Sequence, residues 1–186
     1  MSESDEILIG RIAAGDKAAM HTLFARHQVK VFRFVLRIVG DAALAEDTVS
    51  ETFIDAWQHA GRYEGRSSVS TWLIGIARHR ALTAAARRRP TESLACDAAQ
   101  NAVDPARDPE AELGRKERGA VLRGALAALS REHAEIIDLV YYQEKSIREI
   151  VELLGLPENT VKTRMFYARK RLAALVAGEG VDRAAA

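Results

Sequence analysis

The sequence has few of the residues that cross-link a chain or carry it through a membrane. Its single cysteine, Cys96, excludes an internal disulfide and a structural zinc site built on cysteines. No apolar run approaches the roughly 20 residues that span a bilayer, and the acidic segment 1–6 does not lead into the apolar core of a signal peptide. We therefore predict a cytoplasmic protein without membrane insertion.

Proline is also scarce, and its distribution divides the chain. Three of the four prolines lie between Pro90 and Pro109, in a stretch of small and polar residues without apolar periodicity. The flanking segments, 5–90 and 113–177, are rich in Ala, Leu, Ile and Val and contain few helix breakers. The sequence thus predicts an all-α protein of two small helical domains, 1–89 and 113–186, joined by a flexible linker over 90–112.

The charges nearly cancel, to a net +1, but they are unevenly distributed. Five arginines and no acid lie within residues 78–89, and five basic residues and no acid lie within 159–171. Residues 91–112 carry six acids against one arginine. A single basic stripe is usually a solvated helix face, but two stripes on helices that have their own apolar faces favour binding to nucleic acid.

Helix start and stop signals predict four helices in the N-terminal domain. The first covers 5–14 and ends at Gly15, and the second is capped by Asp16 and ends at Gly40-Asp41. The third covers 42–60. A polar segment over 61–70 then precedes a fourth helix over 72–88, for which Ser70 or Thr71 is the predicted cap.

The third predicted helix has two different faces when its residues are placed at about 100° each. Val49 and Phe53 fall on a core face, whereas the opposite face combines acids with an apolar Ile54. An exposed isoleucine among acids is typical of a protein-binding face, and an ordinary solvated face is the open alternative. This face comprises Asp47, Glu51, Ile54, Asp55 and Gln58.

The fourth predicted helix carries, beside its apolar arc, a second stripe of mixed chemistry. Trp72, Ile76, His79 and Thr83 line this stripe, with Arg80 and Arg87 beside them. Rings that stack on bases, guanidinium groups that meet phosphates and polar groups that read base edges are what single-stranded nucleic acid requires. A second buried face is the alternative interpretation.

The C-terminal domain contains a predicted helix-turn-helix. Residues 146–154 form a short helix, Gly155-Leu156-Pro157 breaks it, and a new helix covers 158–176. In this arrangement the second helix enters the major groove of DNA. Val161, Met165, Ala168 and Leu172 make its packing stripe, and a merely surface-exposed basic helix is the alternative. The predicted DNA-facing residues are Asn159, Lys162, Thr163, Phe166, Tyr167 and Lys170, with Arg164, Arg169 and Arg171 placed to grip phosphates.

Three segments together resemble the extracytoplasmic-function sigma factors of bacterial RNA polymerase. The polymerase-binding helix of that family is similar to residues 45–57 (Ala-Glu-Asp-Thr-Val-Ser-Glu-Thr-Phe-Ile-Asp-Ala-Trp). Its promoter-melting loop and helix resemble residues 63–78, and its recognition helix resembles residues 155–164 together with 168–172. One such segment could be accidental, but three in the family's order, on either side of a linker, identify the chain as a member.

The resemblance implies partners and site residues. The clamp of the polymerase largest subunit would be contacted by Asp47, Ser50, Glu51 and Ile54. The −10 promoter element would be bound by Tyr63, Arg66, Ser67, Ser68, Trp72, Gly75, His79, Arg80 and Thr83. The −35 element would be bound by the nine DNA-facing and phosphate-gripping residues given above, from Asn159 to Arg171. An anti-sigma factor is the implied regulator, and no cofactor, metal ligand or catalytic residue is expected.

Several positions depart from the family pattern. Ser50 stands where the family often has glutamine, His79 replaces a frequent asparagine, and Tyr167 replaces a frequent arginine or histidine. Glu64 and Arg66 alter the common loop pattern. These are positions that set specificity, so the promoter sequence of a relative cannot be carried over to this chain.

Three rival functions explain less of the sequence. A repressor or activator that uses only the helix-turn-helix leaves the N-terminal motifs unexplained. A sigma mimic that titrates an anti-sigma factor has no need of basic residues such as Lys162 and Arg169. An enzyme is disfavoured because the five histidines are scattered and no nucleophile or carboxylate constellation stands out.

Overall fold

The computed structural model describes residues 3–87 and 119–184, and the secondary structure in these ranges is helical. The chain divides into two compact units, unit 1 (Met1–Asp97) and unit 2 (Ala98–Ala186), which confirms an all-α protein with two helical domains. The predicted linker over 90–112, its Cys96 and the domain boundaries beside it lie outside the described residues. None of the described helices combines the length and the apolar character needed to cross a membrane.

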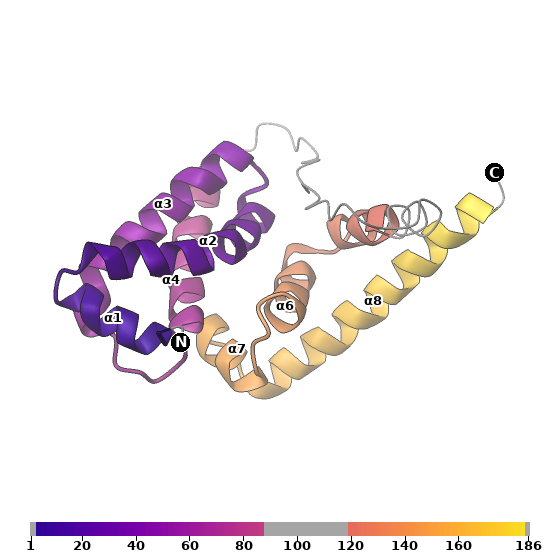
Figure 1. The fold of residues 1–186 in the computed structure, drawn as a ribbon. Coiled ribbons are helices and arrows are strands. Elements are labelled where there is room, and N and C mark those ends of the chain that lie inside the picture. Colours follow the sequence, from indigo (N-terminus) through magenta and orange to yellow (C-terminus); the bar gives the residue numbers. More distant parts are fainter. Residues whose placement is uncertain (1–2, 88–118, 185–186) are drawn as a thin grey trace. The chain divides into compact units, whose positions relative to one another are not determined.

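Figure 1 labels the principal α-helices of unit 1 and unit 2. Unit 1 contains α1 (Asp5–Ala13), α2 (Lys17–Val39), α3 (Ala42–His59), the short 3₁₀ helix η1 (Ala60–Arg62) and α4 (Val69–Arg87). Unit 2 contains a helical stretch at 119–127 followed by α6 (Arg131–Tyr141), α7 (Ile147–Leu154) and α8 (Glu158–Ala184). The last helix extends beyond its predicted end at residue 176.

Side-chain caps and one left-handed glycine fix the ends of α2 and α3. The Asp16 carboxylate accepts hydrogen bonds from the N–H groups of Ala18 and Ala19, at 2.9 and 3.2 Å, so α2 begins at Lys17. Gly40 ends α2 with φ at 70°, a conformation that favours glycine. Asp41 then caps α3 through the N–H of Leu44. The predicted signals at Asp16 and Gly40 are confirmed.

The start of α4 was predicted wrongly. The helix begins at Val69 rather than Trp72, because Ser68 takes the capping position that we assigned to Ser70 or Thr71. The Ser68 hydroxyl accepts a hydrogen bond from the N–H of Thr71 at 3.2 Å. Val69 is 1% exposed, so the earlier start places an apolar side chain of the first turn in the core.

The core of unit 1 lies between α2, α3 and α4, with α1 packed on α2. The inward faces predicted for the third and fourth helices are confirmed, because Val49, Phe53, Leu73 and Ile74 are all buried. Phe53 packs edge-on against Phe24 of α2, with ring centroids 4.8 Å apart. The remaining large buried side chains of the unit are Leu8, Ile9, Ile12, Leu23, Val31, Phe34, Val35 and Val69.

The core of unit 2 joins α6 and α8 and is closed by α7. Ile150 of α7 and Val161 and Ala168 of α8 are fully buried, as the helix-turn-helix prediction requires. Ser146 caps α7 in a reciprocal arrangement: its hydroxyl accepts from the N–H of Glu149, and the Glu149 carboxylate accepts from the N–H of Ser146. Helix α6 contributes the buried side chains of Ile136, Ile137 and Leu139 to this core.

The turn of the helix-turn-helix depends on Gly155, which has φ at 64° and donates its N–H to the Val151 carbonyl. Gly155→Ala should destabilise unit 2 by about 1 kcal/mol or more, because a Cβ is strained in the left-handed region. Gly10→Ala in α1 is the matched control and should stabilise unit 1 by about 0.5–1 kcal/mol, since its Cβ would meet open space. Urea denaturation followed by circular dichroism measures both. A Gly155→Ala protein as stable as the wild type would contradict this assignment.

Candidate polymerase and nucleic-acid interfaces

The buried residues of α3 determine which of its residues face outward. Thr48, Thr52 and Ala56 are buried together with the apolar residues described above. The four residues predicted to contact the polymerase, Asp47, Ser50, Glu51 and Ile54, are all exposed. Ile54 is 55% exposed, so the helix presents an apolar side chain on the same face as two acids. The structure therefore brings the four predicted residues onto one accessible face.

Asp55, on the edge of that face, is tied to α4. Its carboxylate accepts two hydrogen bonds from Arg80, from Nε at 2.6 Å and from Nη2 at 2.5 Å. The hydrogen bonding with Arg80 lowers the pKa of Asp55. Arg80 Nη1 also lies 3.3 Å from a carboxylate oxygen of Glu51. Arg80, which we predicted to bind DNA, thus links α4 to the acidic face of α3.

The loop before α4 is closed on itself by aromatic residues. The Tyr63 hydroxyl donates to the Ser67 carbonyl at 2.5 Å, and the Tyr63 ring packs against the Trp72 ring at 5.5 Å between centroids. Burial raises the pKa of Tyr63, and the nearby acids Glu6 and Asp5 raise it further. The tip of the loop, at Gly65 and Arg66, remains exposed. These contacts therefore fix the conformation of the loop before a partner binds, and the loop tip stays accessible.

The predicted −10 residues of α4 form a stripe along one side of the helix. Trp72, Gly75, His79 and Thr83 recur every three or four residues, which places them on one side of an α-helix. His79 is exposed, whereas the other three are half-buried. The Thr83 hydroxyl donates to the His79 carbonyl at 2.9 Å. The exposure of His79 argues against the alternative of a second buried face.

The predicted −35 residues project from α8 on the side away from its packing stripe. Phe166 is 61% exposed, and its ring meets that of Tyr167 edge-on at 5.4 Å. The guanidinium of Arg169 lies 5.5 Å from the centre of the Tyr141 ring, a cation–π contact with α6 that the sequence did not predict. The other exposed residues of the predicted set are Asn159, Lys162, Thr163, Lys170 and Arg171.

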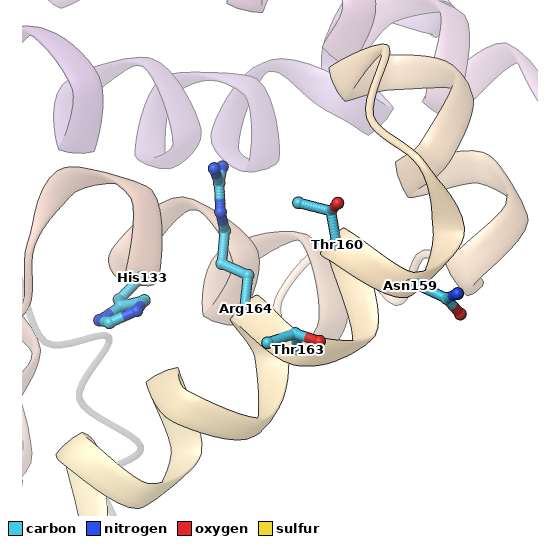
Figure 2. A pocket seen from close by; sticks show the side chains of 5 residues that line it. All are labelled: His133, Asn159, Thr160, Thr163 and Arg164. Carbon is cyan, nitrogen blue, oxygen red and sulfur yellow. The ribbon is translucent and has the colours of Figure 1, made fainter.

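An open pocket of about 400 Å³ lies beside the start of α8 (Figure 2). Arg164 lines it and is 20% exposed, with Nη2 3.0 Å from the Glu132 carboxylate of α6. In Figure 2 the side chains of Thr160 and Arg164 extend from the same side of α8. Hydroxyl, amide, imidazole and guanidinium donors together suit phosphate oxygens. The lining residues are His133, Asn159, Thr160, Thr163 and Arg164.

Two of these lining residues, His133 and Thr160, were not among the predicted site residues. His133 lies in the first turn of α6 and reaches the pocket only because α6 packs on α8. Thr160 could have been assigned from its place between Asn159 and Val161 at the start of the recognition helix. In the part of the chain that the structure describes, no group of three or more His, Cys, Asp or Glu could hold a metal ion.

Two known protein families match the parts of the chain that carry the candidate interfaces. The sigma-70 region 2 family matches residues 23–91, which include α3, the loop and α4. The sigma-70 region 4 family matches residues 120–172, which include α6, α7 and the exposed stripe of α8. The ECF RNA polymerase sigma factor SigL of Mycobacterium tuberculosis is 33% identical over 172 residues, 92% of this chain and 96% of SigL. The chain belongs to the extracytoplasmic-function (ECF) sigma factors.

Further relatives agree with this ECF sigma-factor assignment. The RNA polymerase sigma-H factor of Pseudomonas aeruginosa is 30% identical over 178 residues, which cover 91% of this chain and 92% of sigma-H. The fold is similar to that of the sigma factor RpoE of Bartonella quintana, solved in complex with the anti-sigma factor NepR. The TM-score is 0.66 and the identity 23%, over 84% of this chain and 96% of RpoE. The family predicted from the three sequence segments is confirmed.

The Asp55–Arg80 ion pair of this sigma factor makes the stability of unit 1 depend on pH. Because the folded-state pKa of Asp55 lies below the ordinary 3.8, the pair stabilises the fold above that value, and the contribution is lost as pH falls through the lower pKa. Asp55→Asn should therefore be destabilising near neutral pH, and its difference from wild type should shrink below about pH 4. Urea denaturation across this range measures it, with Asp47→Asn as the control for charge lost from α3. A difference that stays constant into acid would contradict the ion pair.

Proposed function

We propose that the two units of this ECF sigma factor divide promoter recognition between two forms of DNA. As a member of its family the protein is a transcription initiation factor that directs RNA polymerase to −10 and −35 promoter elements. In our proposal it acts in the cytoplasm by binding and strand opening, without covalent chemistry of its own. The observation that carries the proposal is that each predicted contact set lies on an outward helix face or an exposed loop within a matched sigma-70 region.

The first step is binding of α3 to the polymerase clamp. Ile54 supplies an exposed apolar anchor, and Asp47 and Glu51 supply negative charge on the same face of the helix, in the turns before it. An apolar centre with a charged surround is the usual anatomy of a protein interface. Ser50, on the same face, already donates its hydroxyl hydrogen to the Glu46 carbonyl, so it offers a partner no free hydrogen-bond donor.

The second step is capture of the −10 element as a single strand. Tyr63 and Trp72 hold the loop in shape, so little conformational entropy remains to be lost when a base enters. Arg66 at the loop tip and His79 on α4 are both exposed. When a base stacks on the Trp72 ring, its edge would hydrogen-bond to these polar groups, and its phosphate would pair with the arginines of α4.

The third step is recognition of the −35 element by the major-groove face of α8. Phe166 is placed to contact a thymine methyl, and Lys162 to donate to a base edge. Arg169 and Arg171 lie farther along the helix, where a recognition helix approaches the phosphate backbone. The pocket around Arg164 would take one further phosphate.

Run-off transcription with purified core polymerase on a promoter library tests the proposal as a whole. The unmodified protein should produce discrete transcripts with no metal or small molecule beyond the Mg²⁺ and nucleoside triphosphates that polymerase itself uses. The reason is that we propose an anti-sigma factor as its regulator, and the sigma factor RpoE was solved in complex with the anti-sigma factor NepR. Sequences enriched among the active templates would define the −35 and −10 elements. A protein that binds duplex DNA but never supports transcription would instead be a repressor that uses only the helix-turn-helix.

Asp47→Lys should weaken binding to core polymerase about tenfold or more, because a charge at an interface is replaced by its opposite. Helix content and melting temperature should stay near wild type, since Asp47 is exposed. Glu46→Lys makes the same charge reversal at the preceding exposed residue of α3, outside the proposed contact set, and is the matched control. Fluorescence titration with labelled core measures the affinity. If both variants bound as wild type does, α3 would present only a solvated face.

Base reading and phosphate gripping should separate on α8. Phe166→Ala should reduce affinity for the selected −35 duplex by about 1–3 kcal/mol and relax base preference locally. Arg171→Ala should weaken binding to all duplexes alike and flatten the dependence of log K on log salt by about one. Anisotropy titrations on selected and scrambled duplexes distinguish them. A sequence-independent loss for Phe166→Ala would remove it from the reading set.

A further inference from the structure

Two of the cations on the DNA-facing part of α8 are held by carboxylates of the same chain. Lys162 Nζ lies 2.6 Å from the Glu158 carboxylate, one helical turn before it. Arg164 Nη2 lies 3.0 Å from Glu132, which belongs to α6. Farther along α8, Lys170 and Arg171 have no carboxylate partner among the residues that the structure describes. Lys162 and Arg164 are thus restrained by carboxylates, whereas Lys170 and Arg171 are not, and Arg169 is held instead by its contact with the Tyr141 ring.

Helix electrostatics explains only part of this pattern. Glu158 and Glu132 each lie in the first turn of a helix, where negative charge is favourable. That preference explains why acids occupy these turns, but it does not determine which side chains the acids contact. The hydrogen bonding with Lys162 lowers the pKa of Glu158, so the pair is charged at neutral pH. Both carboxylates are largely exposed.

The donor geometry of the two cations decides which DNA contacts the pairs permit. A lysine ammonium has three N–H donors and an arginine guanidinium has five. Lys162 can therefore keep Glu158 and still donate to a base edge in front of α8. Swinging towards a phosphate at the groove wall would take its ammonium away from Glu158. Arg164 likewise has N–H groups left to donate to one phosphate at the pocket. Its contact with Glu132 restrains it from moving to other phosphates.

We propose that Glu158 and Glu132 are positioning residues, which hold Lys162 and Arg164 for one register of promoter DNA and away from phosphates of unrelated duplex. A duplex of the wrong sequence offers phosphates but not the matching base edge. Lys162 must then leave Glu158 to gain a contact or bind without one, and Arg164 reaches no phosphate beyond the one at the pocket. The matching duplex retains the pairs and gains the base contact. The two carboxylates therefore raise the ratio of specific to non-specific affinity. This inference rests on the proposed reading of the −35 element by α8.

The test compares the full-length wild type with a Glu132→Gln/Glu158→Gln double variant on selected and scrambled −35 duplexes. Binding to the scrambled duplex should tighten about three- to tenfold at low salt, the range expected for two exposed ion pairs. Its slope of log K against log salt should steepen by about one for each released cation. Binding to the selected duplex should change less, so that the specificity ratio falls. Glu158→Asp, which keeps the charge, should stay close to the wild-type ratio.

Glu3→Gln is the control for each of the single variants Glu132→Gln and Glu158→Gln, because it removes one carboxylate and breaks an exposed ion pair, with Arg11, in unit 1. It should leave the ratio and the slope unchanged. An equal gain on both duplexes, or an unchanged slope, would overturn the proposal in favour of a net-charge effect or a role in helix stability. Loss of the selected duplex alone would mean that Glu158 reads a base itself. If the wild type bound both duplexes equally, the proposed role of α8 would fail first.

Discussion

Burial of one apolar stripe on each of α3, α4 and α8 determines which residues the protein can offer to a partner. Each fully buried Val, Leu or Phe contributes about 1.5–3 kcal/mol, whereas an exposed ion pair contributes about 0–1 kcal/mol. The rotation of α3 is therefore set by Val49 and Phe53, and that of α8 by Val161 and Ala168. Ile54 and Phe166 are exposed as a consequence. The proposed functional faces therefore consist of residues that the two cores do not bury.

Electrostatic contacts act within the limits that the cores set. Arg80 joins Asp55 and Glu51, so the helix proposed to bind the −10 strand and the face proposed to bind polymerase share a charged contact. On α8 the pairs of Lys162 and Arg164 restrain side chains whose helix is already placed. These contacts are individually weak, but they lie where DNA and polymerase would arrive. They add less to stability than the cores do, and we propose that they also help to select among partners.

Features that depend on local chemistry were predictable from the sequence. The cap at Asp16, the left-handed glycines Gly40 and Gly155, and the two faces of α8 follow from propensity and periodicity alone. Features that depend on packing were not. The Asp55–Arg80 pair joins residues 25 positions apart, and His133 reaches the pocket only through the contact of α6 with α8. The cap of α4 was misplaced because several hydroxyl residues compete there and burial of Val69 selects Ser68.

The central claim is that α8 acts on duplex DNA and α4 on a strand that exists only after opening. His79→Ala in the holoenzyme tests it most directly, because His79 is exposed on α4 and its removal leaves the cores intact. Binding to closed promoter duplex and the rate of opening, followed by permanganate reactivity of unpaired thymines, are measured on the same template. The account predicts nearly unchanged duplex binding and slowed opening. Weakened duplex binding with a normal rate of opening would contradict it.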